Sequence, residues 1–311
     1  MPLFLKPVFQ ERIWGGTALK RFNYQIPNEY TGECWAISAH PNGTNIIENG
    51  RHQGKTLEEV WNEDKALFGV SGNAKFPLLT KILDANDKLS VQVHPDNAYA
   101  QKHEGEYGKT ECWYILDAQE DAEIIYGVNA KNQTELNDMI DQQQFDELFH
   151  KVKVKAGDFF YVPAGTVHAI GEGILILETQ QSSDTTYRIY DYERTDNNGN
   201  QRELHLEQSK AVINLAATSP NTTPKQEIVQ GQTYTQFVSN DFFTVERWMI
   251  DGVLNYEKPS AYCLVSIVEG NGNVETNDEV YNLEKGTHFI LTTEDYDIAF
   301  NGNMTIIISY V

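Results

Sequence analysis

The chain has 311 residues, of which 40% are hydrophobic and 11% aromatic, enough for about two folded domains and too many for a disordered chain. Its formal net charge of −21 argues against nucleic acid as a partner, and a phosphate-bearing substrate would need a local positive pocket. The apolar runs are too short for a membrane span and the start resembles no secretion signal, so we expect neither. Three scattered cysteines, Cys34, Cys112 and Cys263, include no C-x-x-C pair and suit a reducing cytoplasm.

The elements expected in chain order are mostly short strands separated by Gly and Asn turns. Thr56 and Glu59 have the spacing of a capping box, so a helix is expected from Leu57, and Asp96 is expected to cap another through about His103. Further helices are expected at 134–149 and 203–217, and strands at about 34–39, 76–83, 89–96, 110–115, 122–127, 158–162, 173–179, 186–191, 242–250, 261–268, 287–292 and 304–310. Many short strands favour β-barrels or sandwiches, and the segment 219–224 predicts the main boundary.

Two segments, 154–162 and 283–291, share a pattern: an apolar residue, a charged residue, a glycine, a polar residue and an apolar strand. Aligned in this way, His168 falls opposite Asp297, and His288 does not align with it. The C-terminal part is therefore expected to be a second copy that lacks a metal ligand, with His288 as a structural residue.

Three separate stretches supply candidate metal ligands. The alternation in 89–96 puts Gln92 and His94 on the same strand face, Glu111 begins a second strand, and His168 ends a third stretch. A lone histidine is more often a hydrogen-bonded polar residue than a metal ligand, and a lone glutamate at the end of a strand is usually solvated. The proposal is that these four side chains converge on one metal ion; by ligand type the set would accept zinc or iron.

The stretch from Gly157 to His168 matches G-x5-P-x-G-x2-H, the second motif of cupin barrels, except that Glu172 stands where asparagine is usual. The first cupin motif is replaced by Gln92-x-His94 and the more distant Glu111. We therefore expect a mainly β chain of two cupin-type jelly-roll barrels with a few peripheral helices. Residues 1–218 would form the metal-binding domain with added helices, and 225–311 a degenerate barrel without metal.

The chain also closely resembles the type I mannose-6-phosphate isomerases of the cupin superfamily, in their short bacterial form. The resemblance covers about the first two thirds of the chain at motif level and the remainder by architecture only. The matching stretches are 11–16 (ERIWGG), 32–35 (GECW), 91–96 (VQVHPD), 108–113 (GKTECW), 163–168 (PAGTVH) and 178–191 (ETQQSSDTTYRIYD). Thr110 replaces a proline common in longer members, and the chain has no room for their separate helical domain.

This resemblance implies one zinc ion per chain, held by Gln92, His94, Glu111 and His168. It implies interconversion of mannose 6-phosphate and fructose 6-phosphate, in which a proton moves between C1 and C2 through an enediol. The partner would be a small sugar phosphate; the sequence leaves the oligomeric state open.

The resemblance also assigns roles to residues around the metal. Arg188 would offset the enediolate charge or bind the phosphate. Without the resemblance, the pattern around it indicates an ordinary arginine on a strand surface. Lys109, otherwise a solvated loop lysine, suits proton transfer, because a nearby zinc would lower its pKa. Glu178 is a further candidate for moving the proton. The remaining expected substrate contacts are Trp14, Lys81 and Ser90.

Two other functions are open at this point. A cupin oxygenase would need redox-active iron, and Gln92 in place of a histidine weighs against it. A non-catalytic sugar-binding cupin would not need the full set of ligands together with Arg188 and Lys109.

Overall fold

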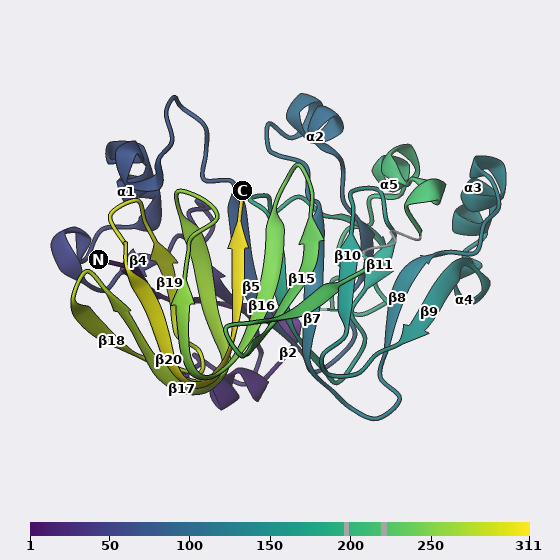
Figure 1. Cartoon of the computed structure of the whole chain (residues 1–311). Coiled ribbons are helices and arrows are strands. Elements are labelled where there is room, and N and C mark those ends of the chain that lie inside the picture. The colour runs from purple at the N-terminus through teal and green to yellow at the C-terminus, as the bar shows by residue number, and fades with distance from the viewer. Residues whose placement is uncertain (196–198, 219–222) are drawn as a thin grey trace.

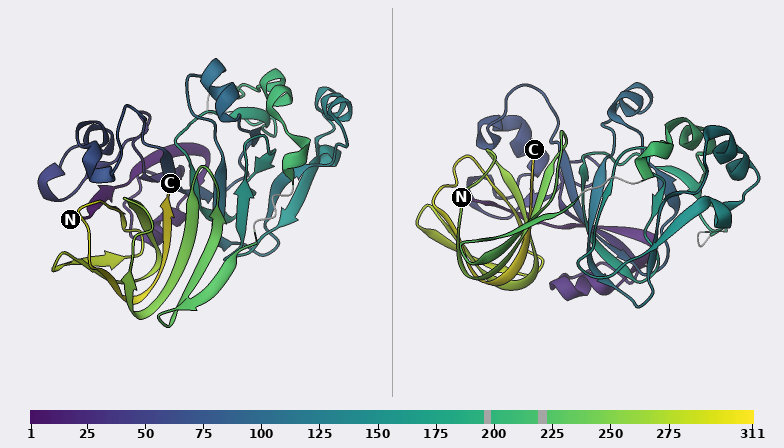
Figure 2. Two further views of the ribbon diagram at one scale, coloured as in Figure 1. Left: turned by 45° about the horizontal axis from the view of Figure 1, so that its top comes forward. Right: turned by 45° about the vertical axis from the view of Figure 1, so that its right-hand side comes forward.

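The structure, a computed structural model, describes residues 1–195, 199–218 and 223–311. Strands dominate it, in two β-rich halves that lie side by side with the helices at the periphery (Figures 1 and 2). The prediction of a mainly β chain with a few peripheral helices is confirmed. The described strands form three sheets whose paths do not close into rings, so closure into two jelly-roll barrels is not confirmed. Most of the predicted boundary segment 219–224 lies outside the described residues.

The largest sheet has nine strands and contains all strands of the C-terminal half. Its order is β14-β15-β16-β20-β17-β19-β1-β4, with β18 paired to β17. Its members are β14 (Lys225–Val229), β15 (Gln232–Ser239), β16 (Thr244–Tyr256), β17 (Cys263–Thr276), β18 (Glu279–Glu284), β19 (His288–Leu291), β20 (Ile298–Tyr310), β1 (Leu3–Lys6) and β4 (Ile46–Ile47). Leu3 of β1 pairs with Ile290 of β19, and Leu5 pairs with Ile47. The first strand of the chain is therefore part of the C-terminal sheet.

Two smaller sheets build the other half. One has the order β10-β7-β12-β5-β3-β2 and the other β13-β6-β11-β8-β9. The first contains β10 (Phe159–Val162), β7 (Glu111–Ala118), β12 (Ile174–Gln181), β5 (Leu78–Ala85), β3 (Thr31–Ile37) and β2 (Val8–Gly16); the second contains β13 (Tyr187–Tyr190), β6 (Val91–Val93), β11 (His168–Ala169), β8 (Glu123–Val128) and β9 (Phe149–Lys153). One apolar cluster spans both sheets, with Leu83, Ile115 and Ile176 from one and Ile124 from the other. Burying these side chains holds the two sheets face to face.

The helices are short and lie outside the sheets. They are α1 (Leu57–Glu63), α2 (Asn97–His103), α3 (Gln133–Asp141), α4 (Phe145–Leu148) and α5 (Leu206–Val212), with 3-10 turns η1 (Ala18–Phe22), η2 (Gly50–His52), η3 (Lys65–Phe68) and η4 (Leu215–Thr218). The predicted capping box is confirmed, since the Glu59 N–H donates to the Thr56 hydroxyl and the Thr56 N–H donates to the Glu59 carboxylate. Asp96 caps α2 as predicted. No helix within the described ranges is long and apolar enough to span a membrane.

Two helix predictions were too long. The helix predicted over 134–149 breaks after α3, because Gln143 adopts a left-handed conformation with φ 55° and turns the chain toward α4 and β9. The helix predicted over 203–217 is confined to α5. Its start is delayed because the His205 N–H donates to the Arg188 carbonyl, which keeps the preceding chain beside β13.

The two segments with a shared pattern have the same local structure. Gly157 and Gly286 are both left-handed, with φ 91° and 93°, and lead into β10 and β19. His288 is buried, with Nδ1 2.9 Å from the Ser266 hydroxyl and Nε2 2.6 Å from the Tyr24 hydroxyl. These contacts agree with the prediction that His288 is structural.

Candidate active site

The six-stranded sheet places one row of site residues across three strands. Glu178, in the middle of β12, is paired with Lys81 of β5 on one side and with Trp113 of β7 on the other. Glu111 lies two residues before Trp113 and so leaves the same face of β7. The Trp113 indole N–H lies 3.0 Å from Glu111 Oε1 and 3.2 Å from Glu178 Oε2, so it links the two carboxylates.

The five-stranded sheet supplies a second row. Gln92 of β6 is paired with His168 of β11 on one side and with Arg188 of β13 on the other. The strand that carries Gln92 therefore lies between the strands that carry His168 and Arg188. His94 comes two residues after Gln92, directly beyond the end of β6. Because the two sheets face each other, these residues meet the Glu111 row.

His94, Glu111 and His168 form a buried cluster at this meeting point. Their ligand-type atoms lie within 4.8 Å of one another, and each residue is about 1% exposed. His94 Nε2 lies 3.4 Å from Glu111 Oε2, and His168 Nε2 lies 3.4 Å from Glu111 Oε1. Both of these imidazole nitrogens and Glu111 Oε2 are buried without a hydrogen-bond partner among the described residues. Unpartnered buried polar atoms are costly, so this arrangement fits a metal ion that would satisfy them.

The protonation states of the cluster also fit a metal. Burial, with help from the Lys109 charge, lowers the pKa of His94 to about 3, and burial lowers the pKa of His168. Burial acts to raise the pKa of Glu111, but Lys109 and the two imidazoles outweigh it and hold that pKa far below its usual range. Two neutral imidazoles and an ionised carboxylate are the forms that ligate metals. His168 Nδ1 lies 2.9 Å from the Thr166 carbonyl, a contact that orients the ring.

A cavity of about 480 Å³ opens between the two rows and is within the usual size of small-molecule sites. Seven of the ten predicted site residues line it: Trp14, Lys81, Ser90, Gln92, Lys109, Glu178 and Arg188. The other three, His94, Glu111 and His168, form the buried cluster beside it. Gln92 belongs to both regions, since it lines the cavity and is the strand partner of His168. The structure therefore brings all ten residues into one region.

Lys109 and Glu178 are both buried and differ in their charge environment. Lys109 Nζ lies 3.5 Å from Glu111 Oε2. Burial acts to lower the pKa of Lys109, but Glu111, Glu178, Asp184 and Glu33 together raise it. Burial, followed by the Glu111 charge, raises the pKa of Glu178 to about 7. Glu178 can thus exchange a proton near neutral pH, whereas the carboxylates around Lys109 favour its cationic form.

The sequence analysis missed a charged group at one wall of the cavity. Glu33 of β3 is buried and accepts from Arg12 Nε at 2.7 Å and from the Trp35 indole at 2.6 Å, and it lies 3.5 Å from Lys81 Nζ. Lys81 in turn lies 3.9 Å from Glu178. Glu33 and Arg12 fall within two of the stretches that resemble the isomerase family, and this resemblance is the sequence signal that could have identified them.

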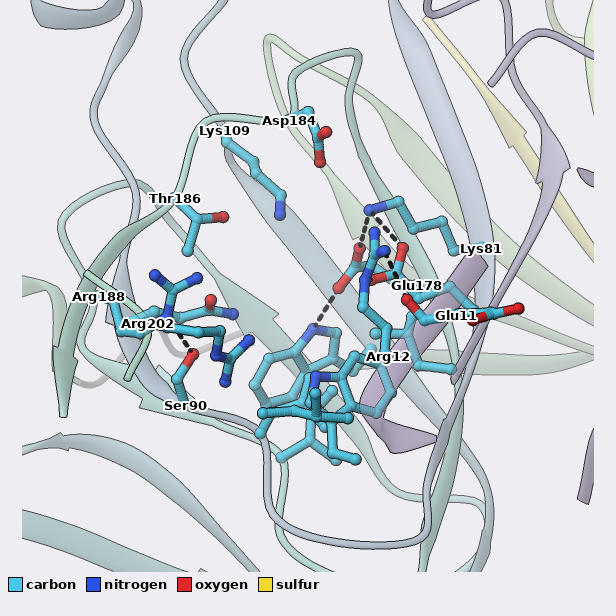
Figure 3. Close-up of a pocket in the computed structure, with 18 residues that line it drawn as sticks. Glu11, Arg12, Lys81, Ser90, Lys109, Glu178, Asp184, Thr186, Arg188 and Arg202 are labelled. Atoms are coloured by element: carbon cyan, nitrogen blue, oxygen red, sulfur yellow. Dashed lines mark hydrogen bonds and ion pairs between the residues drawn. The ribbon is translucent and has the colours of Figure 1, made fainter. Parts of the chain in front are cut away.

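The cavity has unlike sides (Figure 3). Lys81 and Glu178 lie on one side, near Glu11 and Arg12, and Arg188 and Arg202 lie on the other, beside Ser90 and Thr186. Arg188 Nε lies 3.3 Å from the Ser90 hydroxyl. Arg202 was also missed by the sequence analysis, because it comes from the segment after β13 and has no recognisable motif around it.

The fold and the site together describe a mainly β protein in which a buried group that could hold a metal ion lies beside a charged cavity for a polar small molecule. Comparison with known proteins gives the family. Residues 3–123 match the profile described as phosphomannose isomerase type I, catalytic domain, and residues 233–311 match mannose-6-phosphate isomerase, cupin domain. The chain is 54% identical to a mannose-6-phosphate isomerase of Streptococcus mutans over 99% of this chain and 98% of that protein. It is 50% identical to a mannose-6-phosphate isomerase of Bacillus subtilis over 100% and 99%.

Solved structures agree with this assignment. The crystal structure of a mannose 6-phosphate isomerase from Bacillus subtilis matches with a TM-score of 0.97 at 47% identity, covering 100% of this chain and 99% of that one. A putative mannosephosphate isomerase from Archaeoglobus fulgidus shares the fold, with a TM-score of 0.78 at 20% identity over 100% and 98%. The chain belongs to the type I phosphomannose isomerases, a family of enzymes, and the predicted resemblance is confirmed. Membership favours an isomerase over the cupin oxygenase and the non-catalytic binder.

Proposed function

We propose that the enzyme interconverts mannose 6-phosphate and fructose 6-phosphate in a zinc-dependent reaction that passes through an enediol. The observation that carries this proposal is the buried His94–Glu111–His168 group beside a cavity that also presents Lys109, Glu178 and Arg188. Close relatives that are named for this activity support the substrate.

Gln92, His94, Glu111 and His168 would hold one zinc ion per chain. When bound, zinc supplies Lewis acidity that polarises the sugar oxygens near C1 and C2. Gln92 adds a neutral oxygen to two neutral imidazoles and one carboxylate, a set with hard and borderline donors that zinc accepts. Iron has similar preferences, so the choice of zinc comes from the family resemblance.

The chain's own residues would carry the proton transfer. Glu178, with a pKa raised to about 7, is suited to accept the C2 proton of mannose 6-phosphate and return it to C1. Arg188, always cationic, would offset the negative charge that develops on the enediolate oxygens. Lys109, kept cationic by the surrounding carboxylates, would donate to a sugar oxygen rather than act as the base. Trp14, Lys81 and Ser90 would contact the substrate from the cavity walls.

A coupled isomerase assay before and after chelation, with zinc added back, tests substrate and metal dependence together. We expect conversion of mannose 6-phosphate to fall at least about 100-fold on chelation and to return with zinc. Full activity in metal-free protein would contradict the zinc proposal.

The chain offers a matched pair of variants for the ligand assignment. His168→Gln should lose both metal and activity, whereas His288→Gln changes the buried histidine after the second glycine turn and should keep both. Metal content per chain, measured by elemental analysis, is the readout besides activity. Equal metal content in the two variants would contradict the role of His168.

We also infer that residues 1–218 form a metal-binding cupin unit and 225–311 a metal-free cupin unit. The shared glycine turns before β10 and β19 support two related units. We place the enzyme in the cytoplasm, and the support is that Cys34, Cys112 and Cys263 are all free thiols.

A further inference from the structure

One carboxylate behind the cavity joins three separate segments of the chain. Glu106 lies in the loop between α2 and β7 and is not among the described residues that line the cavity. Its Oε2 accepts from the Ser183 hydroxyl at 3.1 Å, from the Asp184 N–H at 3.2 Å and from the Thr185 hydroxyl at 3.1 Å. Its Oε1 lies 3.3 Å from Nε2 of His40, a buried residue just after β3. Glu106 therefore connects residues that are 66 to 79 positions away from it in the sequence.

The hydrogen-bond roles in this network are mutually consistent. The Asn42 N–H donates to His40 Nδ1 at 3.2 Å, so this nitrogen is the acceptor of the ring. A neutral imidazole then carries its hydrogen on Nε2 and donates it to Glu106. The Asn42 side chain completes the network, because its Nδ2 donates to Asp184 Oδ2 at 2.9 Å. Each of the described groups around the Glu106 carboxylate is thus a donor, which suits the ionised form. Burial acts to raise the pKa of Glu106, but these hydrogen bonds lower it below its usual range.

The segment that Glu106 holds contributes to the cavity. Residues 183–186 form an irregular connection between β12 and β13, and Asp184 and Thr186 line the cavity. Figure 3 shows the Asp184 carboxylate at the same rim as the Lys109 ammonium, and the charge of Asp184 acts on Lys109. Side chains hold the backbone of this segment, since the Asp184 N–H donates to Glu106 and the Thr185 N–H donates to the Ser183 hydroxyl. Its position therefore depends on the Glu106 carboxylate rather than on a sheet ladder.

We propose that Glu106 is a positioning residue, whose carboxylate fixes residues 183–185 and thereby holds Asp184 at the rim of the cavity beside Lys109. Lys109 comes three residues after Glu106 in the same loop, and its N–H donates to the Pro95 carbonyl at 3.0 Å. One loop thus carries Lys109 and also holds the segment that carries Asp184. The two charged side chains are kept in a fixed relation to each other. This inference rests on the proposed isomerase function, because both side chains face the cavity of the proposed substrate.

The first test compares steady-state kinetics of the zinc-loaded enzyme with those of Glu106→Ala and Glu106→Gln. Glu106→Ala should lower kcat for mannose 6-phosphate by about 10- to 100-fold, because small displacements of groups around the reacting atoms slow a reaction strongly. Its KM should change by less than about threefold, since Glu106 itself does not contact the substrate. Glu106→Gln should lie between the two, because its carbonyl oxygen can still accept from residues 183–185, whereas its amide cannot accept from His40. The metal content per chain should equal that of the parent in both variants.

A second test asks whether Glu106 acts through Asp184. Asp184→Asn alone should also lower kcat. The double variant with Glu106→Ala and Asp184→Asn should be at most about threefold slower than Asp184→Asn, because residues that act through one another do not add their effects.

A third test does not depend on catalysis. Amide hydrogen exchange of residues 182–187, measured by mass spectrometry, should be at least about tenfold faster at Asp184 in Glu106→Ala, since its N–H loses its acceptor. Glu104→Gln is the matched control, because Glu104 is exposed at the start of the same loop and accepts from the Tyr187 hydroxyl at 2.6 Å. It should keep kcat within about twofold of the parent and leave the exchange at Asp184 unchanged. Thermal unfolding midpoints establish that each variant is folded, and Glu106→Gln carries the same tests if Glu106→Ala does not fold.

A kcat within about twofold of the parent in the Glu106 variants would overturn the proposal, and so would unchanged exchange at Asp184. Losses of kcat that multiply in the double variant would also overturn it, because Glu106 would then act independently of Asp184. Failure of the proposed function would look different. The unmodified enzyme would then not convert mannose 6-phosphate, whereas the difference in exchange between Glu106→Ala and the parent would remain.

Discussion

Glu33 offers a quantitative test of the charged wall of the cavity. Burial acts to raise the pKa of Glu33, but Lys81, Arg12 and the hydrogen bonds from Trp35 and Arg12 lower it from 4.5 to about 2. At 1.36 kcal/mol per pKa unit, this corresponds to about 3 kcal/mol in favour of the folded, ionised form. Arg12 is partly exposed and screened by solvent, so we expect Glu33→Gln to cost about 2 kcal/mol at pH 7.

The direction of the pKa shift of Glu33 determines how this cost depends on pH. The folded pKa of Glu33 lies below the unfolded one, so the stabilisation is present above about pH 4.5 and is lost as the pH falls toward 2. Urea unfolding of the parent and of Glu33→Gln, both metal-free, should differ by about 2 kcal/mol at pH 7 and by clearly less near pH 3. Glu11→Gln, at an exposed carboxylate of the same cavity, should stay within about 0.5 kcal/mol of the parent. A difference that is equal at both pH values would refute the role of the Glu33 charge.

Three further changes test other parts of the molecule. Arg188→Ala should lower isomerase turnover at least about 100-fold while the metal content per chain is unchanged, and full turnover would refute its role at the enediolate. Burial lowers the pKa of His288 to about 3, so the buried ring resists protonation. The free energy of unfolding should therefore be unaffected by this ring above about pH 6.5 and fall by about 1.4 kcal/mol per pH unit from there toward pH 3. Urea unfolding of His288→Asn should lack this part of the pH dependence. Gly171→Ala would bring a Cβ to 1.9 Å from the Glu123 carbonyl oxygen, and calorimetry should show a loss of about 1–3 kcal/mol; an unchanged midpoint would contradict this close contact.

Patterns with fixed spacing predicted several of the residues that the structure brings into one region. The motif around Gly157 predicted a strand followed by His168 as a candidate ligand, and the alternation in 89–96 placed Gln92 and His94 on one strand face. Both follow from local geometry, because a strand alternates its side chains and a glycine permits the turn that precedes it. The family resemblance then added Glu111, which has no distinguishing feature of its own.

The residues that were missed depend on which strands become neighbours. Glu33 becomes part of the wall only because β3 lies beside β5, where Trp35 is paired with Lys81. Nothing local in the sequence encodes that pairing, and a strand glutamate normally faces solvent. Arg202 reaches the cavity through its bonds to Asp191, eleven residues earlier. The helix ends near Gln143 without a glycine or proline, so none of the residues that usually predict a helix end is present there.

The pairing of β1 with β19 has a consequence for synthesis on the ribosome. Leu3 emerges at the start of translation, and its partner Ile290 is made nearly 290 residues later. At a translation rate of about 5–20 residues per second, β1 is synthesised roughly 15 to 60 seconds before β19. During that interval the edge of β1 that pairs with β19 is unpaired in the nascent chain. A polypeptide that ends before β19 would leave this edge exposed permanently.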